Sequence, residues 1–197
     1  MGKTKVIFFT GAGISVDSGI PTFQEQPGIR DKLSRDFANE YPEEYREAIC
    51  EMVDCCENAE PNAAHIAIAE GGFPVITMNV DKLHTKAGNQ NVIEIHGVLP
   101  TREELDEELF PITYDGIVLY GDIAPKYEEA IKLVKSLEYG KSYFIIVGTS
   151  FYTGISETLL KIAKQRKAVI EVINSNASER VPVICKNLQN CDPKGET

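Results

Sequence analysis

The stretch VIFFTGAGISVDSGIPTF, residues 6–23, decides what kind of fold this chain can form. Residues 6–10 are a short apolar run of the kind that forms a buried strand. The turn GAGIS, residues 11–15, follows at once, and its small residues let backbone N–H groups approach a diphosphate. A full G-x-G-x-x-G motif would need a glycine where Val16 stands. The turn therefore favours a nucleotide site, and an ordinary strand-to-helix turn stays open as the alternative.

Short apolar runs recur along the rest of the chain and alternate with stretches of helical periodicity. The runs predict strands at residues 6–10, 74–78, 92–95, 117–120, 143–147 and 169–173. The periodic stretches predict helices at residues 42–57, 61–70, 127–138 and 155–167. Because strands that alternate with helices form parallel sheets, we expect an α/β fold built on a Rossmann-like, doubly wound parallel sheet.

Two segments fit that sheet poorly. Residues 24–60 are polar and helical, and we expect them to form a small helical insert that could close over a bound cofactor. Residues 97–116 are rich in acidic side chains and indicate a short solvated connection. The polar tail, residues 187–197, is expected to fray. We expect a single domain that spans residues 1–197.

The composition argues against several classes of protein. The net charge of −10 opposes non-specific nucleic-acid binding, which needs a basic face. No run approaches the ~20 apolar residues of a membrane span, and residues 1–13 do not resemble a signal peptide. The five cysteines form no C-x-x-C pair, so the sequence specifies no zinc site. We expect a cytoplasmic protein with no metal, and with neither a nucleic acid nor a membrane as its partner.

Polar side chains stand directly after two of the predicted strands. Asn79 and Asp81 follow residues 74–78, and His96 follows residues 92–95. The carboxyl ends of parallel strands meet at one edge of a sheet, where the ligand sites of α/β proteins assemble. A histidine there can accept a proton from a sugar hydroxyl, because its pKa lies near neutrality. A lone histidine after a strand is usually structural, so it is the coincidence of three polar residues that indicates a site.

Small polar residues follow the last two predicted strands. The sequence GTS, residues 148–150, follows the strand at 143–147, and Asn174 follows the strand at 169–173. Such residues can hydrogen-bond ribose and phosphate, although each is also common in an ordinary turn. Their place at the same sheet edge extends the candidate site.

Taken in order, these motifs resemble those of the sirtuins, a family of NAD-dependent protein deacylases. Residues 11–23 match the family's GAGIS-x-x-SGIP-x-F, and residues 77–97 match its T-x-N-x-D-x-L-H…AG…HG block. Residues 117–125, IVLYGDIAP, match its I-V-x-Y/F-G-E/D-x-x-P segment. GTS and the late asparagine complete the order, so that the likeness spans nearly the whole chain. His65 and His84 also match family positions, which we interpret as structural.

The resemblance implies NAD as the cofactor and a role for each matching residue. His96 would be the general base that acts on a ribose hydroxyl. Asn79 and Asp81 would complete the catalytic group and orient the nicotinamide end of NAD. The implied substrate-binding residues, which would border an acyl-lysine channel, are Tyr120, Gly121 and Asp122. The implied cofactor-binding residues are Gly11, Ala12, Gly13, Ile14, Phe23, Gln24, Asn79, Asp81, Gly148, Thr149, Ser150 and Asn174.

Four departures from the family pattern bear on this interpretation. Gln24 stands where an arginine is expected, and Arg30 could supply the missing cation. Met78 stands where a glutamine is usual beside the ribose. Gly154 and Ser156 stand near positions at which the family prefers an apolar residue and a proline. The four zinc cysteines are absent, which predicts a compact form without the zinc module.

The first functional hypothesis is therefore protein-lysine deacylation. In the family, the carbonyl oxygen of an acyl-lysine protein or peptide attacks the ribose carbon as nicotinamide leaves, and the products are nicotinamide, free lysine and O-acyl-ADP-ribose. The changes at Gln24 and Met78 keep two alternatives open. The same pocket could serve an NAD hydrolase or an ADP-ribosyltransferase, or it could be a non-catalytic sensor of NAD or ADP-ribose.

Overall fold

A five-stranded parallel sheet forms the centre of the protein. The computed structural model describes residues 4–22, 25, 27–107, 110–111, 113–150 and 153–190. The strand order is β3-β2-β1-β4-β5, and every neighbouring pair is parallel. The strands are β1 (Lys5–Thr10), β2 (Val75–Thr77), β3 (Val92–Glu94), β4 (Ser142–Val147) and β5 (Val169–Ile173). This order confirms the doubly wound parallel sheet that the sequence predicts.

β1 lies in the middle of the sheet because it is apolar on both faces. Phe8 and Phe9 are both fully buried, and as neighbours in a strand they point to opposite faces. The chain continues from β1 to β2 and β3, then crosses to β4 on the other side. The direction of winding therefore reverses beside β1. The loops after β1 and β4 meet there, at the edge where α/β proteins bind ligands.

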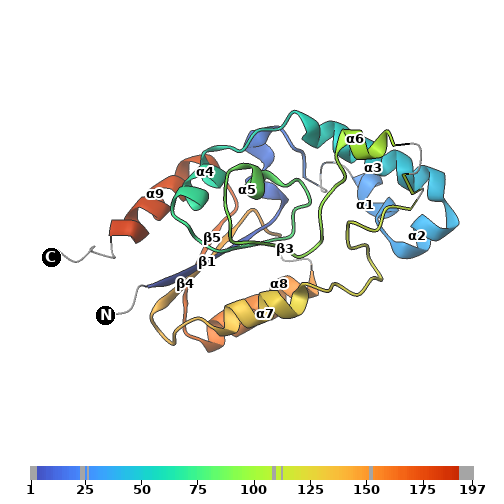
Figure 1. Cartoon of the computed structure of the whole chain (residues 1–197). Helices are drawn as coiled ribbons and strands as arrows, with labels where there is room; N and C mark the ends of the chain where they lie inside the picture. The colour runs from blue at the N-terminus through green and yellow to red at the C-terminus, as the bar shows by residue number, and fades with distance from the viewer. Residues whose placement is uncertain are drawn as a thin grey trace.

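Helices cover both faces of the sheet, as Figure 1 shows. One face carries α4 (Ala63–Glu70), α5 (Leu83–Lys86) and α9 (Ala177–Asn190). The other carries α7 (Tyr127–Lys135) and α8 (Gly154–Gln165). Ile68 of α4 is buried in the same cluster as Phe8, and Leu159 of α8 is buried with Phe9. Each face of β1 thus has its own apolar core.

A third group of helices lies beyond the sheet, at the right of Figure 1. It consists of α1 (Pro27–Lys32), α2 (Arg35–Glu40), α3 (Pro42–Glu57) and α6 (Arg102–Leu105). We call these four helices the helical region. They share a separate core in which Tyr45, Ile49, Leu105 and Ile117 are buried. This region overhangs the carboxyl edge of the sheet and so forms one wall of the site described below.

The expected strand at residues 117–120 is wrong. The segment makes only isolated bridges, from Ile117 to Gly97 and from Tyr120 to Ser34, and it does not join the sheet. Ile117 and Leu119 are buried in the core of the helical region instead. An apolar run predicts that its residues are buried, and here they pack against a group of helices and not in a sheet.

The expected solvated connection at residues 97–116 is also wrong in part. Leu99 and Leu105 are 4% and 3% exposed and belong to the core of the helical region. Between them, Thr101 and Glu104 form a reciprocal capping box that begins α6. Glu103 and Glu104 are exposed on this short helix, and Asp106 and Glu107 are exposed directly after it.

α9 was not predicted from the sequence, and the expected fraying from residue 187 is wrong as far as the helix extends. α9 continues to Asn190, and residues 191–197 lie outside the described residues. Pro182 stands inside the helix, where it removes a backbone hydrogen bond and argues against a helix in the sequence. Val181 and Cys185 are buried against the sheet, and this burial outweighs that cost.

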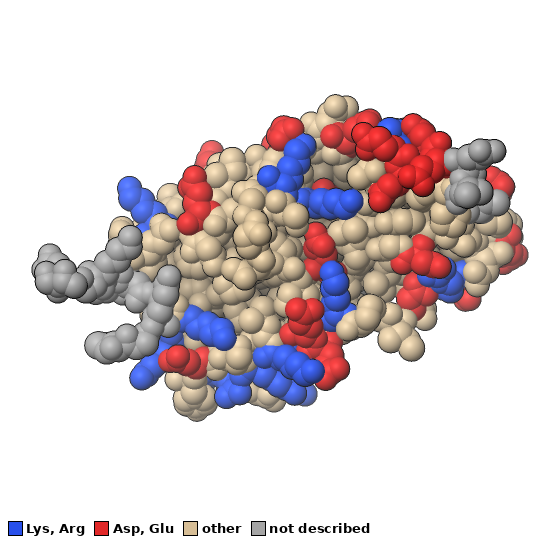
Figure 2. Space-filling model, viewed as in Figure 1, with Lys and Arg blue, Asp and Glu red and all other residues tan. Residues whose placement is uncertain are grey.

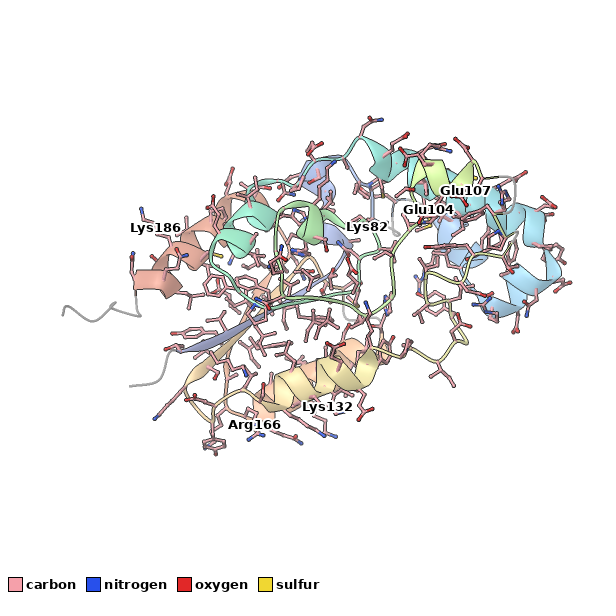
Figure 3. The ribbon with its side chains drawn as sticks, in the orientation of Figure 1. Lys82, Glu104, Glu107, Lys132, Arg166 and Lys186 are labelled. Atoms are coloured by element: carbon pink, nitrogen blue, oxygen red, sulfur yellow. The ribbon has the colours of Figure 1, made fainter. Side chains whose placement is uncertain are left out.

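Charges are unevenly distributed over the face shown in Figure 2. Acidic side chains gather over α3 and α6, whereas Lys and Arg gather over α7 at the lower edge. Figure 3 labels Glu104 and Glu107 in the first area and Lys132 and Arg166 in the second. The wall that the helical region contributes to the site therefore has an acidic outer surface.

Candidate active site

Two glycine-containing loops pack backbone to backbone at the carboxyl edge of the sheet. The Gly11 N–H donates to the Val147 carbonyl at 2.9 Å, and the Gly13 N–H donates to the Gly148 carbonyl at 3.0 Å. A Cβ on Gly13 would lie 2.6 Å from the Gly148 Cα. Gly148 itself has a φ of +64°, a conformation that favours glycine. These glycines are therefore required by the approach of the two loops.

The loops line an open cavity of about 330 Å³, which we call the cofactor groove. Most of the cofactor-binding residues expected from the sequence surround it. Those in its lining are Gly11, Ala12, Gly13, Asn79, Gly148, Thr149, Ser150 and Asn174, together with His96. Asn174 and Thr149 also hold each other, because the Thr149 N–H donates to Asn174 Oδ1 at 3.1 Å and Asn174 Nδ2 donates back to the Thr149 carbonyl at 3.2 Å.

Two of the expected cofactor residues, Asp81 and Ile14, lie elsewhere: Asp81 lines a small neighbouring cavity, and Ile14 is not in the lining of the groove. Ile14 is fully buried in the core beneath the groove, and its N–H donates to the Gly11 carbonyl at 3.1 Å. It shapes the turn and does not line the groove. Phe23 and Gln24 lie outside the described residues.

Arg30 lies on α1 and lines the cofactor groove opposite the glycine loops. It also lines the neighbouring cavity that contains Tyr120. A guanidinium in this place is a cation that can reach a bound phosphate. The idea that it replaces the arginine missing at position 24 stays a prediction, and this placement supports it.

Asn79, Asp81 and Ser15 form a closed hydrogen-bond network. Ser15 Oγ donates to Asp81 Oδ2 at 2.7 Å, and Asn79 Nδ2 lies 3.1 Å from both of these atoms. The other oxygen of Asp81 accepts the Leu83 N–H at the start of α5. The network fixes both side chains that the sequence singled out. Ser15 is the partner that sequence reasoning missed, although it is part of the motif that reasoning used.

A small cavity of about 50 Å³ lies against this network. Its lining combines the polar groups of Ser15, Asn79 and Asp81 with apolar or weakly polar neighbours. These neighbours are Ala12, Ile20, Pro21, Met52, Cys55, Cys56 and Val80. A cavity of this kind suits one small planar polar ring, such as an amide-bearing pyridine.

His96 stands at the end of β3 with both ring nitrogens occupied. Nδ1 lies 3.2 Å from the Met78 carbonyl, and Nε2 lies 3.0 Å from the Tyr127 hydroxyl. A carbonyl oxygen only accepts, so Nδ1 must carry the proton and Nε2 must be the acceptor. Burial lowers the pKa of His96, and the bond to Met78 opposes that change. The ring is therefore a neutral base at neutral pH, with its lone pair on Nε2.

Met78 explains two of the departures from the family pattern together. Its sulfur lies 3.4 Å from Thr153 Oγ1 and 3.4 Å from Ser156 Oγ, and it accepts from one of these hydroxyls while the other donates to its fellow hydroxyl. Ser156 and Thr153 also bond each other at 2.6 Å. Met78 and Ser156 thus contact one another, and the two unusual residues form one matched packing unit behind His96.

The segment Tyr120-Gly121-Asp122 borders a second cavity of about 300 Å³, which we call the acyl channel. Its wall is mostly apolar and includes Leu33, Met52, Val80, Ile117 and Leu119. Asp122 does not offer a free carboxylate, because Arg35 Nε and Nη2 each donate to it at 2.8 Å. These bonds hold the pKa of Asp122 below its ordinary value. Asp122 anchors the segment to α2.

His65 and His84 are structural groups, and two of the cysteines, Cys56 and Cys185, are unreactive. His65 and His84 are buried with ring centroids 4.7 Å apart, and His84 Nε2 bonds Thr10 Oγ1 at 3.0 Å. Burial lowers the pKa of both rings. Burial raises the pKa of Cys56 and Cys185 to about 12, which makes these thiols poor nucleophiles.

Two further classes of feature are missing from the part of the chain that the structure describes. Within it, no three His, Cys, Asp or Glu side chains come together as a metal site. None of its helices is both long enough and apolar enough to cross a membrane.

Comparison with known proteins agrees with this geometry. A family model described as "Sir2 family" matches residues 11–105. A protein of Thermodesulfovibrio yellowstonii named NAD-dependent protein deacetylase is 32% identical over 90% of this chain and 82% of its own length. A protein of Archaeoglobus fulgidus named NAD-dependent protein deacylase 2 is 31% identical over 93% of this chain and 85% of its own length.

Solved structures show the same fold. A complex of a mutant Sir2 homologue with ADP-ribose has a TM-score of 0.82 at 24% identity, and the match covers 98% of this chain and 95% of that one. A solved structure described as one of the Sir2 enzymes has a TM-score of 0.79 at 28% identity, and the match covers 95% of this chain and 94% of that one. Because its relatives match over most of both lengths and its motifs form one site, the chain belongs to the Sir2 family.

Proposed function

We propose that this protein is an NAD-dependent protein-lysine deacylase that releases nicotinamide and forms O-acyl-ADP-ribose. One observation carries the proposal: His96 lines both the cofactor groove and the acyl channel. A base in that position can reach a ribose hydroxyl on one side and lies beside an acylated lysine on the other. The named activity of the relatives points to the same reaction.

The residues of the groove fit NAD from end to end. The turn at residues 11–13 lies where a diphosphate needs small residues, and Arg30 faces it from α1. Thr149, Ser150 and Asn174 offer polar groups for the adenosine side. The small cavity beside Asn79 offers the nicotinamide end a partly polar place. Bound NAD supplies a glycosidic bond whose leaving group is nicotinamide.

The protein's own residues then have separable tasks. Asn79 and Asp81, fixed by Ser15, orient the nicotinamide end and hold the ring away from water. The acyl channel brings the carbonyl oxygen of an acyl-lysine to the ribose carbon, and its apolar wall receives the acyl group. Nε2 of His96 accepts the proton of a ribose hydroxyl, because burial keeps the ring neutral.

The substrate is therefore an acyl-lysine in a protein or peptide. Two alternatives use the same groove, namely NAD hydrolysis and ADP-ribosyl transfer, since water or another nucleophile could attack the same carbon. The shared lining of groove and channel favours deacylation over both, because hydrolysis needs no second cavity beside the base. Cytoplasmic location stays a prediction from the sequence.

The decisive experiment measures nicotinamide release from NAD with and without an acetyl-lysine or longer acyl-lysine peptide. Wild type is compared with His96→Ala. Peptide-dependent release that disappears in the variant supports deacylation with His96 as base. Release without peptide indicates hydrolysis or ADP-ribosyl transfer. If NAD binds but no nicotinamide is released under any condition, the protein is a sensor and the proposal fails.

A further inference from the structure

The first residue of α7, Tyr127, contacts the proposed base directly. Its hydroxyl lies 3.0 Å from His96 Nε2, and the two ring centroids are 6.0 Å apart. The ring of Tyr127 packs against the core of the second sheet face, while its hydroxyl end lines the acyl channel. The side chain therefore has an apolar part that the fold uses and a polar part that is directed at His96.

The chemistry of the two contacts of His96 assigns a donor to each. Nδ1 faces the Met78 carbonyl, which cannot donate, so the proton of the neutral ring sits on Nδ1. Nε2 then carries the only lone pair in the ring plane, and the Tyr127 O–H must donate to it. The contact stabilises the neutral tautomer whose lone pair lies on Nε2, whereas a protonated ring would donate from Nε2 to the phenol oxygen.

We propose that Tyr127 is a positioning residue that holds the ring of neutral His96 with its lone pair on Nε2, until a ribose hydroxyl takes over that hydrogen bond. This inference rests on the proposed role of His96 in NAD-dependent deacylation. One lone pair accepts one strong donor, so the incoming hydroxyl replaces the phenol at Nε2. The proton that His96 accepts comes from the substrate, and the Tyr127 O–H keeps its own proton throughout.

Other groups near His96 are less suited to this task. The titratable or charged neighbours are Arg30 from α1, Tyr120 and Asp122 from the segment at 117–122, Glu94 from β3, and Lys126 and Tyr127 from the start of α7. Asp122 is bound by Arg35, and Glu94 lies 4.0 Å from Lys126. Tyr127 is the member of this set, within the described residues, whose polar atom bonds the His96 ring.

Tyr127→Phe tests the proposal because it removes the hydroxyl and keeps the packing ring. The chain has only three histidines, so His96 can be assigned in an NMR titration by comparison with His96→Ala. The phenol oxygen can accept a charge-assisted bond from protonated Nε2 that is stronger than the bond it donates to the neutral ring, so loss of the hydroxyl should lower the pKa of His96 by about half a unit to one unit. Tyr139→Phe is the matched control, since Tyr139 is 59% exposed and remote from the groove, and it should leave that pKa unchanged.

The kinetic counterpart is the pH profile of kcat/KM for NAD with a saturating acyl peptide. Its acid limb should move to lower pH in Tyr127→Phe by the same half unit to one unit, while kcat on the alkaline plateau stays within about threefold of wild type. If Tyr127 only packs, its replacement by the equally bulky Phe should leave the thermal midpoint, the acid limb and the pKa of His96 where they are.

A measurement on the wild-type protein keeps the proposal testable even if Tyr127→Phe does not fold. Ring nitrogen shifts of His96 in the protein without NAD should show a protonated Nδ1 and an unprotonated Nε2. The opposite tautomer, or an unchanged His96 pKa in folded Tyr127→Phe, overturns the proposal. Neither NMR measurement needs turnover. A protein that binds NAD without releasing nicotinamide would therefore refute the proposed function, while the NMR results would still decide the role of Tyr127.

Discussion

The half of the site on the sheet and the half on the helical region are held in different ways. On the sheet, main-chain bonds from Gly11 and Gly13 lock the two loops together. On the helical region, long side chains make the links: Arg35 holds Asp122, and the Tyr45 hydroxyl donates to the Tyr114 carbonyl at 2.8 Å. The cofactor side is therefore preorganised by backbone geometry, whereas the acyl side depends on a few contacts that can be removed singly.

The largest expected effect comes from disrupting the main-chain packing between the two glycine-containing loops. Gly13→Ala would place a Cβ 2.6 Å from the Gly148 Cα, and main-chain atoms cannot yield as a flexible side chain can. We expect a loss of about 1–3 kcal/mol in the free energy of unfolding, typical of overpacking, and NAD affinity at least tenfold weaker. Chemical denaturation and calorimetric titration with NAD measure the two effects.

Gly28→Ala is the matched control, because a Cβ there meets nothing within 4 Å and the residue lies in α1. It should be neutral or slightly stabilising, since alanine is the better helix former. If Gly13→Ala binds NAD as wild type does, the loops are more yielding than their packing indicates and the contrast between the two halves is lost.

The same contrast explains what could be predicted from the sequence. Continuous apolar strands and the small turns after them are local patterns, so the sheet and the positions of Asn79, Asp81 and His96 at its edge could be read directly. The segment at 117–120 has an equally apolar pattern, but its partner is the helical region. Periodicity reports that a residue is buried and does not report what buries it.

Contacts between distant residues were the other limit. Tyr127 meets His96 across 31 positions of sequence, and the start of α7 fixes that meeting to within one residue. Ser15 meets Asp81 across 66 positions. Tyr127 and Ser15 are ordinary residue types, and nothing in the neighbouring sequence shows which distant residue either one contacts. α9 was missed for a different reason. Pro182 does disfavour a helix locally, but the burial of apolar side chains of α9 against the sheet outweighs that effect.

The second effect in size tests the sheet side through pH. His65 and His84 are buried and neutral, with pKa values lowered by burial, while in the unfolded chain they titrate near 6.5. Their stabilising contribution is complete above the unfolded pKa and is lost as pH falls below it, because only the unfolded chain takes up the protons. We expect the free energy of unfolding to fall by about 2.5 kcal/mol between pH 7 and pH 5.5.

Urea denaturation at a series of pH values measures this slope. His65→Phe removes one of the two protons at issue and should flatten the slope below pH 6 by up to about 1.4 kcal/mol per pH unit. Equal stability of the wild type at pH 7 and pH 5.5 would mean that the buried pair protonates without unfolding.

A smaller effect is expected when the helical region is loosened at its main link. Arg35→Met removes both hydrogen bonds to Asp122 and the ion pair with Asp115, and it keeps much of the aliphatic stem. Because the pair is partly exposed, we expect a cost of about 1 kcal/mol in stability. The KM for an acyl peptide should rise about fivefold, and the Kd for NAD should not change.

Lys132→Met is the control for a lost cation, since Lys132 pairs with Glu128 on the exposed side of α7, far from the channel. It should change neither constant. An equal rise in the Kd for NAD in Arg35→Met would show that the two halves of the site are coupled, against the division proposed above.

The smallest expected effect sharpens the comparison by acting on the helical region away from the site. Thr101→Ala removes the hydroxyl that accepts the Glu104 N–H at 3.2 Å. The reciprocal hydrogen bond, from the position 101 N–H to the Glu104 carboxylate, is then no longer supported by its partner. Loss of such a cap costs about 1 kcal/mol, here confined to α6 and its buried Leu105. Denaturation should show this cost, while KM for the peptide stays within about twofold because Tyr120 and Asp122 are anchored through α2.

Glu103→Gln, a change in the same turn outside the capping box, should cost less. A peptide KM in Thr101→Ala that rises as far as in Arg35→Met would mean that the helical region supports the acyl channel as one rigid unit, and that Arg35 is only one of many equivalent links.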